Sequence, residues 1–332
     1  MNYNSDKKYQ GKSNLYSFLF RLLVTGSLLG ILYWQIDFQE VGRIISGLHK
    51  SSLVIAILLV FAAIILSAYK WQLLLAARGW RLPFGSLVKV YFLGLFANNF
   101  LPSSIGGDLI RIYQIGKRIN NHTEAAASVI LERILATIGL ALPVLLAILP
   151  NQQLLGSFTH VVFYFLLFCV GMVIIIIKPE MFKPLLKLPW DWWQRVIAKL
   201  KDINLVIKGY RTSSITLWQV IGYSVLFQII IVLINYFLLH SLKIDRVSFW
   251  QCLLIVPIIS ALSMIPISIN GLGIREGAYV LLLAPLHVTS SQAVILSLLF
   301  FLIVTVVSLL GGVIFLLERE KGDYLDGREI TP

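Results

Sequence analysis

The sequence predicts an all-α polytopic membrane protein, with about six full spans and two re-entrant hairpins of broken helix in an inverted-topology repeat. Hydrophobic residues make up 58% of the chain and charged residues 13%, whereas about a quarter of a soluble domain is charged. Apolar runs recur at the length of ~20 residues that crosses a ~30 Å hydrocarbon core. Proline, glycine and arginine also recur at one fixed offset in two apolar regions. Together these observations predict the fold.

Six apolar runs are long enough to be spans, and two further regions are interrupted. The first run follows basic residues, but no small-residue cleavage pattern closes it, so we expect a retained span and not a signal peptide. The interrupted regions, 87–115 and 249–289, contain Pro, Gly and charges and are predicted to be hairpins that return to the side they entered from. The six predicted spans are 18–36, 52–75, 125–149, 158–178, 215–241 and 291–317.

The chain reads as a duplicated unit. Three residue pairs are separated by 164 positions (266 − 102, 271 − 107 and 275 − 111): Pro102 and Pro266, Gly107 and Gly271, Arg111 and Arg275. The same offset places the span 52–75 on 216–239, and loop charges give these two spans opposite directions. We therefore predict a single membrane domain, 1–332, with repeat one at 52–149 and an inverted repeat two at 215–317.

The distribution of positive charge predicts the orientation. The formal net charge is +12, and 21 of the 28 Lys and Arg residues fall in alternate segments that we assign to the cytoplasm. The positive-inside rule then places both termini in the cytoplasm, in a bacterial-type cell (inner) membrane. Orientation thus explains the charge, and no nucleic-acid partner is expected.

The polar segments offer no soluble domain. The basic connector 178–214 contains eight Lys and Arg residues and a tryptophan cluster. Two interpretations stay open for it: an amphipathic segment on the cytoplasmic leaflet, or a solvated positive-inside loop. Residues 318–332 form a short polar tail.

The two hairpins are predicted to break at proline and glycine. Proline lacks an amide donor, and glycine permits positive φ and close backbone approach. Non-helical backbone at membrane depth is tolerated where protein or a water-filled cavity covers it, so the breaks are predicted to line a cavity. The residues of the breaks are Pro102, Gly106 and Gly107 in the first hairpin and Pro266, Gly271 and Gly273 in the second.

Two arginines beside the breaks suit a phosphate. Arg111 and Arg275 each carry a planar guanidinium that can bind phosphate oxygens at two points, and the restarting half-helix adds its positive N-terminus. Asp108 and Glu276 need partners, because unpaired charges are costly in a membrane. We expect Asp108 to pair with Arg111 or Arg275, and Glu276 with Arg111; alternatively Asp108 caps the next helix.

Further polar residues lie inside the predicted spans. Glu132 and Arg133 point in different directions from one helix; we expect Glu132 to face the cavity, the alternative being that both lie at headgroup level. Lys70 is expected to snorkel to the interface. Gln228 and Asn235 are expected to bond neighbouring helices.

Metal, cofactor and disulfide chemistry are not expected. The two cysteines lie in apolar runs, the five histidines are scattered without ligand spacing, and no nucleotide-binding loop is present. Any driving energy is expected to come from an ion gradient or from the lipid gradient itself.

The combined motifs resemble the flippase-like membrane domain of lysylphosphatidylglycerol synthases, shared with stand-alone proteins, over about 15–320. The resemblance implies movement of a lipid between leaflets and a headgroup site at Asp108, Arg111, Glu132, Arg133, Arg275 and Glu276. An aminoacyl-transferring domain is not expected in this chain, so lysyl transfer is not implied. The matching residues are Asn99, Leu101, Pro102, Gly106, Gly107, Asp108, Arg111, Glu132, Arg133, Pro266, Ser268, Gly271, Leu272, Gly273, Ile274, Arg275 and Glu276.

The leading functional hypothesis is a lipid translocase and not an enzyme. A phospholipid, glycolipid or isoprenoid-linked lipid, with a phosphate-bearing headgroup, would pass through a cavity between the two hairpins. The alternatives are a membrane-embedded transferase acting on a lipid phosphate and a non-catalytic partner of a lipid-modifying enzyme. The expected partners are therefore membrane lipids and, in the last case, that enzyme.

Overall fold

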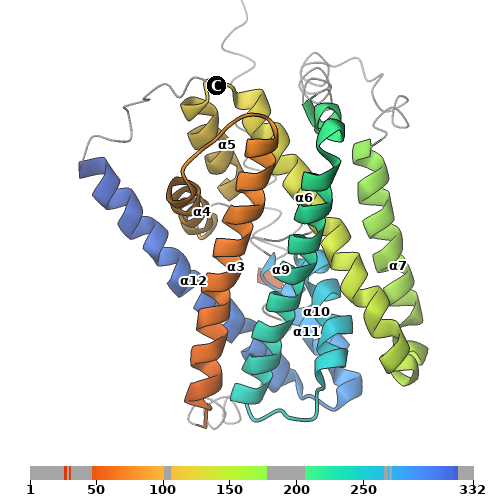
Figure 1. The fold of residues 1–332 in the computed structure, drawn as a ribbon. Coiled ribbons are helices and arrows are strands. Elements are labelled where there is room, and N and C mark those ends of the chain that lie inside the picture. Colours follow the sequence, from red (N-terminus) through yellow and green to blue (C-terminus); the bar gives the residue numbers. More distant parts are fainter. Residues whose placement is uncertain are drawn as a thin grey trace, which may run out of the picture.

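The described part of the protein is a bundle of α-helices (Figure 1). A computed structural model describes residues 26–27, 30, 47–100, 106–177, 206–264, 268 and 271–320, and these contain no strand. The predicted all-α membrane fold is confirmed. The helices are α3 (Lys50–Ala77), α4 (Phe84–Asn98), α5 (Gly106–Arg118), α6 (His122–Ile148), α7 (Gln152–Ile177), α9 (Ser214–Ser241), α10 (Phe249–Ser263), α11 (Ile274–Leu283) and α12 (Ser290–Glu320), with short 3-10 turns at Leu149–Asn151, Tyr210–Ser213 and Ala284–Leu286.

Four helices in the described residues are long and apolar enough to cross a membrane. They cover Lys50–Ala77, His122–Asn151, Ser214–Ser241 and Ser290–Leu317. A helix satisfies all of its backbone polar groups internally, which is what a segment in hydrocarbon requires. The predicted span at 158–178 falls on α7, whose apolar section is shorter, at Phe158–Gly171.

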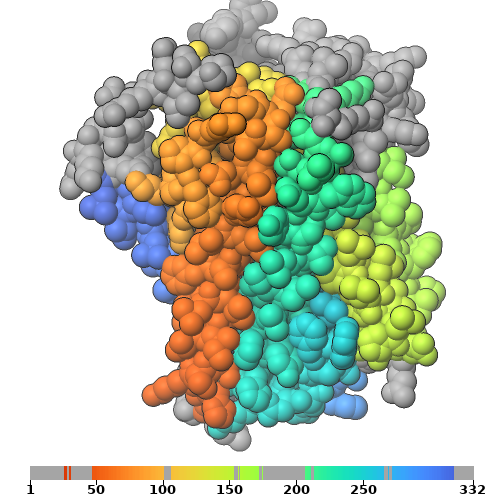
Figure 2. Space-filling model, in the orientation of Figure 1, coloured from red at the N-terminus to blue at the C-terminus, as the bar shows by residue number. Residues whose placement is uncertain are grey.

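Helices α3 and α9 occupy corresponding places in the two halves. Their bounds differ by 164 at both ends (214 − 50 and 241 − 77). They are antiparallel neighbours, because the amide of His49, before α3, donates to the carbonyl of Ser241, at the end of α9, over 2.9 Å. Figure 2 shows their surfaces side by side. An inverted repeat requires this opposite direction; the complete repeat stays a prediction.

Two pairs of short helices interrupt the bundle at the predicted places. In the first, α4 ends at Asn98 and α5 begins at Gly106; in the second, α10 ends at Ser263 and α11 begins at Ile274. The first pair lies toward the upper end of the molecule in Figure 1 and the second toward the lower end. Each pair follows a long helix, α3 or α9, and precedes another, α6 or α12. The predicted breakers Pro102 and Pro266 lie outside the described residues.

Glycines allow the close contacts in both hairpins. A Cβ atom added to Gly107 would lie 2.4 Å from the carbonyl oxygen of Gly94, so α4 and α5 approach closely only because this side chain is absent. In the second hairpin, Gly271 and Gly273 have φ values of 74° and 85°, a region that glycine adopts without steric cost. The glycines thus shape the two turns by different means.

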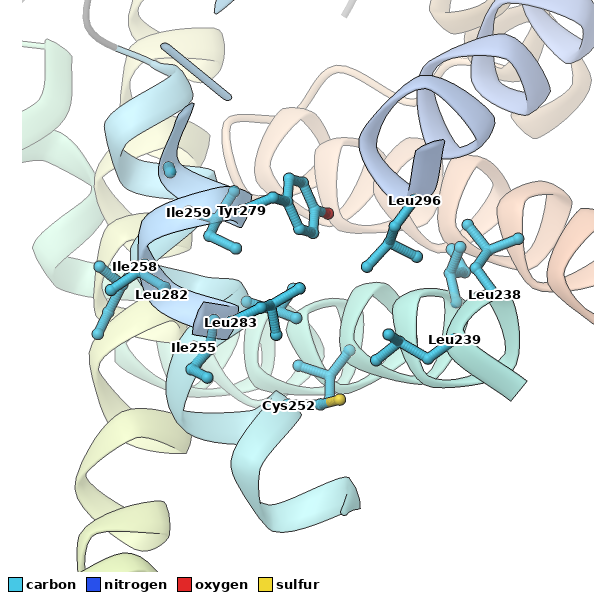
Figure 3. Packing of buried hydrophobic residues seen from close by; sticks show 14 of the residues in the cluster. Leu238, Leu239, Cys252, Ile255, Ile258, Ile259, Tyr279, Leu282, Leu283 and Leu296 are labelled. Atoms are coloured by element: carbon cyan, nitrogen blue, oxygen red, sulfur yellow. The ribbon is translucent and has the colours of Figure 1, made fainter. Parts of the chain in front are cut away.

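The largest buried cluster packs around the second hairpin. Figure 3 shows side chains of α10, such as Ile255 and Ile259, facing Tyr279 and Leu283 of α11, with Leu239 of α9 beside them. These side chains are at least nine-tenths buried. The two helices of the second hairpin thus bury apolar side chains against each other and against α9.

Several sequence-based predictions fall on residues outside those described. These are most of the first span at 18–36, the basic connector over 178–205 and the tail over 321–332. Their predicted positions and roles stay predictions.

Candidate functional site

Charged side chains from three helices meet beside the first hairpin. Lys70 comes from α3, Asp108 and Arg111 from α5, and Glu132 and Arg133 from α6. We call these five residues the first-half cluster. Asp108 and Arg111 are one helical turn apart and face the same side of α5. Because α5 packs against α6, that side meets the adjacent pair Glu132 and Arg133.

Arg111 lies at the centre of the first-half cluster and is 3% exposed. Its Nη2 donates to Oε2 of Glu132, and its Nη1 donates to Oδ1 of Asp108 over 3.2 Å. The guanidinium carbon lies 4.2 Å from the ring centroid of Trp71 and 4.1 Å from that of Tyr91. Among the described residues, its Nε has no acceptor. Arg111 is thus held by two carboxylates and two aromatic rings, and its Nε donor stays without an acceptor.

Glu132 serves several donors at once. Its Oε2 accepts from Arg111, while its Oε1 accepts from the Tyr91 hydroxyl over 3.1 Å and lies 4.0 Å from Nζ of Lys70. The side chain is buried. Glu132 therefore faces the helix bundle, and the cavity predicted at this position stays a prediction.

Arg133 points away from Glu132 and pairs with Asp108. Its Nε and Nη2 donate to the two carboxylate oxygens of Asp108 over 2.9 and 3.0 Å, and about half of its side chain, 48%, is exposed. The adjacent residues of α6 therefore have different partners on α5: Glu132 contacts Arg111, and Arg133 contacts Asp108. The expected pairing of Asp108 with Arg111 is present, and Arg133 adds a second partner.

The alternative that Asp108 caps helix α5 is wrong. Its carboxylate accepts from two arginines, whereas the amide of Gly107 donates to Oδ1 of Asn98 over 2.6 Å. Asn98 belongs to α4, so a side chain from the opposite limb of the hairpin accepts from one free amide in the first turn of α5.

A second charged group surrounds the break of the second hairpin. Arg275 donates through Nη2 and Nε to Oε1 of Glu276 over 2.6 and 3.1 Å. Ser297 of α12 donates to the same carboxylate oxygen over 2.8 Å and accepts from Arg275 Nε over 2.9 Å. The amide of Gly273 donates to Oε2 of Glu276 over 2.6 Å. We call Arg275, Glu276 and Ser297 the second-half cluster.

The expected pairing of Glu276 with Arg111 is wrong, as is the alternative pairing of Asp108 with Arg275. Glu276 turns back toward the first residues of its own helix, where the free amide of Gly273 and the neighbouring Arg275 satisfy it. A carboxylate three residues into a helix is well placed to accept from such amides. Arg111 and Arg275 thus each pair with carboxylates of their own half of the chain.

The two clusters differ in their charge. Among the described residues, the first-half cluster brings three basic side chains to two carboxylates, whereas the second-half cluster pairs one arginine with one glutamate. The first-half cluster therefore has one basic side chain more than it has carboxylates. An anion is the ligand that this excess attracts.

Lys70 is the main site residue that the sequence analysis misplaced. Its side chain is 2% exposed and lies over the Phe227 ring at 4.6 Å, so the predicted snorkelling is wrong. The burial of Glu132 nearby gives the ammonium a carboxylate neighbour inside the protein. An ionisable residue within an apolar run is itself an indication of function, so the position of Lys70 in the sequence could have identified it as a site residue.

Aromatic residues and one serine also escaped the sequence analysis. Trp71 and Tyr91 enclose Arg111, and Trp71 is fixed by a bond from its Nε1 to Ser128 Oγ over 2.9 Å. Ser297 completes the second-half cluster. No pattern separates these aromatic side chains from the other packing aromatics of an apolar helix, so only their spatial position identifies them.

The buried amides of α9 have different surroundings. Asn235 accepts from the hydroxyl of Tyr279 in α11 and donates to Ile231 of its own helix over 2.9 Å. The expected bond to a neighbouring helix is thus present for Asn235. Gln228 is buried, and its Nε2 has no acceptor among the described residues.

A separate ion pair lies just after the end of α3, outside the candidate span. Arg78 donates through Nη2 to Oε1 of Glu124 over 2.6 Å and stacks on the Tyr210 ring at 5.6 Å. The hydrogen bond to Glu124 raises the pKa of the Arg78 guanidinium. This pair joins α3 to the start of α6 and lies apart from the first-half cluster.

An apolar hollow of about 230 Å³ lies between α7 and α10. Its walls include Tyr164, Phe165 and Phe168 of α7 and Ile258 and Leu262 of α10. Such a lining suits hydrocarbon. In the described part of the chain, no group of three or more His, Cys, Asp or Glu side chains could hold a metal ion.

Comparison with known proteins places the chain in a family. A family described as "Lysylphosphatidylglycerol synthase TM region" matches residues 18–312. The chain is also 23% identical over 327 residues to the "UPF0104 membrane protein PH1989" of Pyrococcus horikoshii, covering 90% of this chain and 97% of that protein. With the apolar helices described above, these matches establish a multi-pass membrane protein with a lipid-related membrane domain. The chain belongs to the lysylphosphatidylglycerol synthase TM region family.

Proposed function

We propose that this protein moves a lipid with a phosphate-bearing headgroup between the leaflets of a cell membrane, and that the first-half cluster binds the headgroup. The observation that carries the proposal is the excess of basic side chains over carboxylates beside the first hairpin. Three basic side chains there share two carboxylates, which leaves the cluster suited to one more anion.

The donors of the cluster suit phosphate oxygens. Arg111 has an unused Nε, and Arg133 has a partly exposed guanidinium within the same cluster. Arginine binds phosphate through parallel N–H donors, which gives a directional contact as well as charge. In our proposal, phosphate oxygens approach Arg133 first and then compete with Asp108 and Glu132 for Arg111.

Two further features favour a lipid as the carrier of the phosphate. The family's description refers to an enzyme of lysylphosphatidylglycerol, and the hollow between α7 and α10 is lined by hydrocarbon and aromatic side chains. A lipid presents its headgroup to charged residues while its tails stay among apolar ones. The phospholipid, glycolipid and isoprenoid-linked classes all stay within the proposal where they carry a phosphate.

In this proposal, the arginine of the second-half cluster is not available to a headgroup in the conformation described. Arg275 is already paired with Glu276, so a contact with the headgroup requires that pair to open. The prediction that Arg275 and Glu276 bind the headgroup, through a path between the two hairpins, therefore stays a prediction about a second conformation. Transporters built from inverted repeats alternate between two related conformations, and the antiparallel directions of α3 and α9 are those that an inverted repeat requires.

The proposal is for a transporter and not for a transferase or a passive partner. Buried charge that is only structural would be costly in a membrane, and a partner protein has no need of it. A transferase acting on a lipid phosphate would form a modified lipid, whereas a translocase leaves the lipid unchanged. No lysyltransferase activity is expected.

Reconstitution tests the proposal. The purified protein is placed in liposomes containing a fluorescent phosphatidylglycerol, and a membrane-impermeant quencher reports how fast label reaches the outer leaflet. We expect fast transfer by the wild type, transfer at the protein-free rate for Arg111→Gln, and unchanged transfer for Arg81→Gln, a control at an exposed loop position. Transfer unaffected by Arg111→Gln would refute the site, and a new lipid product would favour the transferase.

A further inference from the structure

Lys70 is a buried amine in the second half of α3, a helix long and apolar enough to cross a membrane. It is 2% exposed, and Phe227 of α9 covers it with its ring at 4.6 Å. Its nearest carboxylate oxygen, Oε1 of Glu132, is 4.0 Å from Nζ, which is longer than a hydrogen bond. Lys70 is therefore close to an acidic group without being bonded to it.

The charged group nearest to Lys70 is Glu132 of α6. Arg111 and Asp108 of α5 and Arg133 of α6 are joined to Glu132 through the ion pairs of the same cluster. The titratable phenols on the other helices packed against α3 are Tyr91 of α4 and Tyr223 of α9, which contacts Tyr69. The described part of α12 up to Leu317 adds no charged side chain.

The two carboxylates are already held by the two arginines. Glu132 accepts directly from Arg111, and Asp108 accepts from Arg111 and Arg133. The Tyr91 hydroxyl takes the oxygen of Glu132 that faces Lys70. These four charges cancel, so a protonated Lys70 would be the one charge of the cluster without a counterion. Burial penalises such a charge strongly.

An added anion reverses this balance. A phosphodiester carries one negative charge, and when it binds at Arg111 the cluster becomes neutral only if Lys70 is an ammonium. Lysine is suited to this exchange because its amine can lose a proton when buried, whereas a guanidinium stays charged. The position thus requires lysine rather than arginine.

We propose that Lys70 takes up one proton when a phosphate anion binds to the first-half cluster and returns it when the anion leaves. The proton passes from water to the Nζ lone pair on binding, and no other bond forms or breaks. The inference rests on the proposed function, since it uses the same anion site. It adds that headgroup binding is linked to protons, so a pH difference across the membrane favours release on the more alkaline side.

Calorimetry measures the proton directly. Binding of dioctanoyl phosphatidylglycerol and, separately, of inorganic phosphate to the detergent-solubilised protein is measured in two buffers with different enthalpies of ionisation. The difference in heat gives the number of protons taken up. For the wild type with the lipid probe we expect about one proton, and an affinity that falls about tenfold per pH unit wherever the free cluster holds the neutral amine.

The variants separate protonation from binding. Lys70→Met keeps the length of the side chain without a titratable group, and Lys70→Arg keeps a permanent charge; both are expected to bind the probe with no proton uptake and no pH slope. Lys50→Met, at an exposed position of the same helix, is the matched control and should retain the wild-type uptake.

Each outcome has a distinct meaning. Wild-type binding without proton uptake, or the same uptake in Lys70→Met, overturns the role of Lys70 and leaves the proposed function in place. If neither probe binds the wild type, the headgroup site fails and the linkage fails with it. Uptake with inorganic phosphate alone, lost in Lys70→Met, retains the linkage and assigns it to free phosphate instead of a lipid.

Discussion

The guanidinium of Arg111 and the carboxylate of Glu132 form a buried ion pair that joins α5, in the first hairpin, to α6, the spanning helix that follows it. The rings of Trp71 and Tyr91 cover the guanidinium from α3 and α4. Four helices thus meet at one charge. Because the pair is enclosed, removing one partner costs the other its closest counter-charge, and Arg111 would keep only its bond to Asp108.

Glu132→Gln is expected to destabilise the protein by about 3–5 kcal/mol, the usual cost of breaking a buried pair by removing one partner. The amide keeps the size of the side chain but leaves the Arg111 charge unbalanced. Thermal unfolding followed by tryptophan fluorescence in detergent should show a lower midpoint. The double variant Arg111→Gln/Glu132→Gln, which removes both charges, should regain part of the loss. Equal midpoints for wild type and Glu132→Gln would contradict the pairing.

Gly107→Ala is expected to prevent normal closure of the first hairpin. The added Cβ would lie 2.4 Å from the backbone oxygen of Gly94, and a cost of about 1–3 kcal/mol is usual for such overpacking. Gly277→Ala is the matched control, since a Cβ there meets nothing within 4 Å. Unfolding midpoints should fall for the first variant and not for the second. Similar midpoints would show that α4 and α5 are less closely packed.

The spans were predictable from the sequence because hydrocarbon requires long apolar helices. The runs predicted at 52–75 and 215–241 match α3 and α9 within two residues at each end. The breaks between α4 and α5 and between α10 and α11 followed from glycine chemistry and from charges within apolar sequence. The charged residues of the candidate site were likewise recognisable by type and position.

Partners were harder to predict than positions. Glu276 could have paired with either arginine on charge alone, but the free amide of Gly273 fixes its carboxylate beside Arg275. Lys70 could have reached the interface, yet Glu132 and the Phe227 ring hold it inside. The partner of a charged residue depends on which side chains of separate helices lie close together, and a single sequence does not give the distances between them.

Ser297→Ala is expected to loosen the second hairpin. The hydroxyl accepts from Arg275 and donates to Glu276, and a buried polar group that loses its partner costs about 1–3 kcal/mol. Ser260→Ala is a suitable comparison, because that hydroxyl bonds to Val256 of its own helix over 2.9 Å. The unfolding midpoint should fall further for Ser297→Ala. The reverse order would contradict the contribution of the Ser297 hydrogen bonds to the stability of the second hairpin.

Orientation can be tested by labelling single cysteines in intact cells. The variants Gln152→Cys and Arg81→Cys, each with Cys169 and Cys252 replaced by alanine, place a thiol at exposed positions in different turns. With cytoplasmic termini, a membrane-impermeant maleimide should label position 152 from outside and position 81 only after permeabilisation. The opposite pattern would reverse the topology, and labelling of both from one side would contradict the predicted spans.

The most direct test of the proposed function compares two lipids that differ in phosphate. The wild-type protein in liposomes is supplied with fluorescent phosphatidylglycerol or with fluorescent monoglucosyl diacylglycerol, which has a polar headgroup without phosphate. Since the first-half cluster has three basic side chains for two carboxylates, we expect fast interleaflet transfer of the phosphatidylglycerol and transfer of the glucolipid at the protein-free rate. Equal acceleration of both lipids, or of neither, would contradict phosphate recognition by this protein.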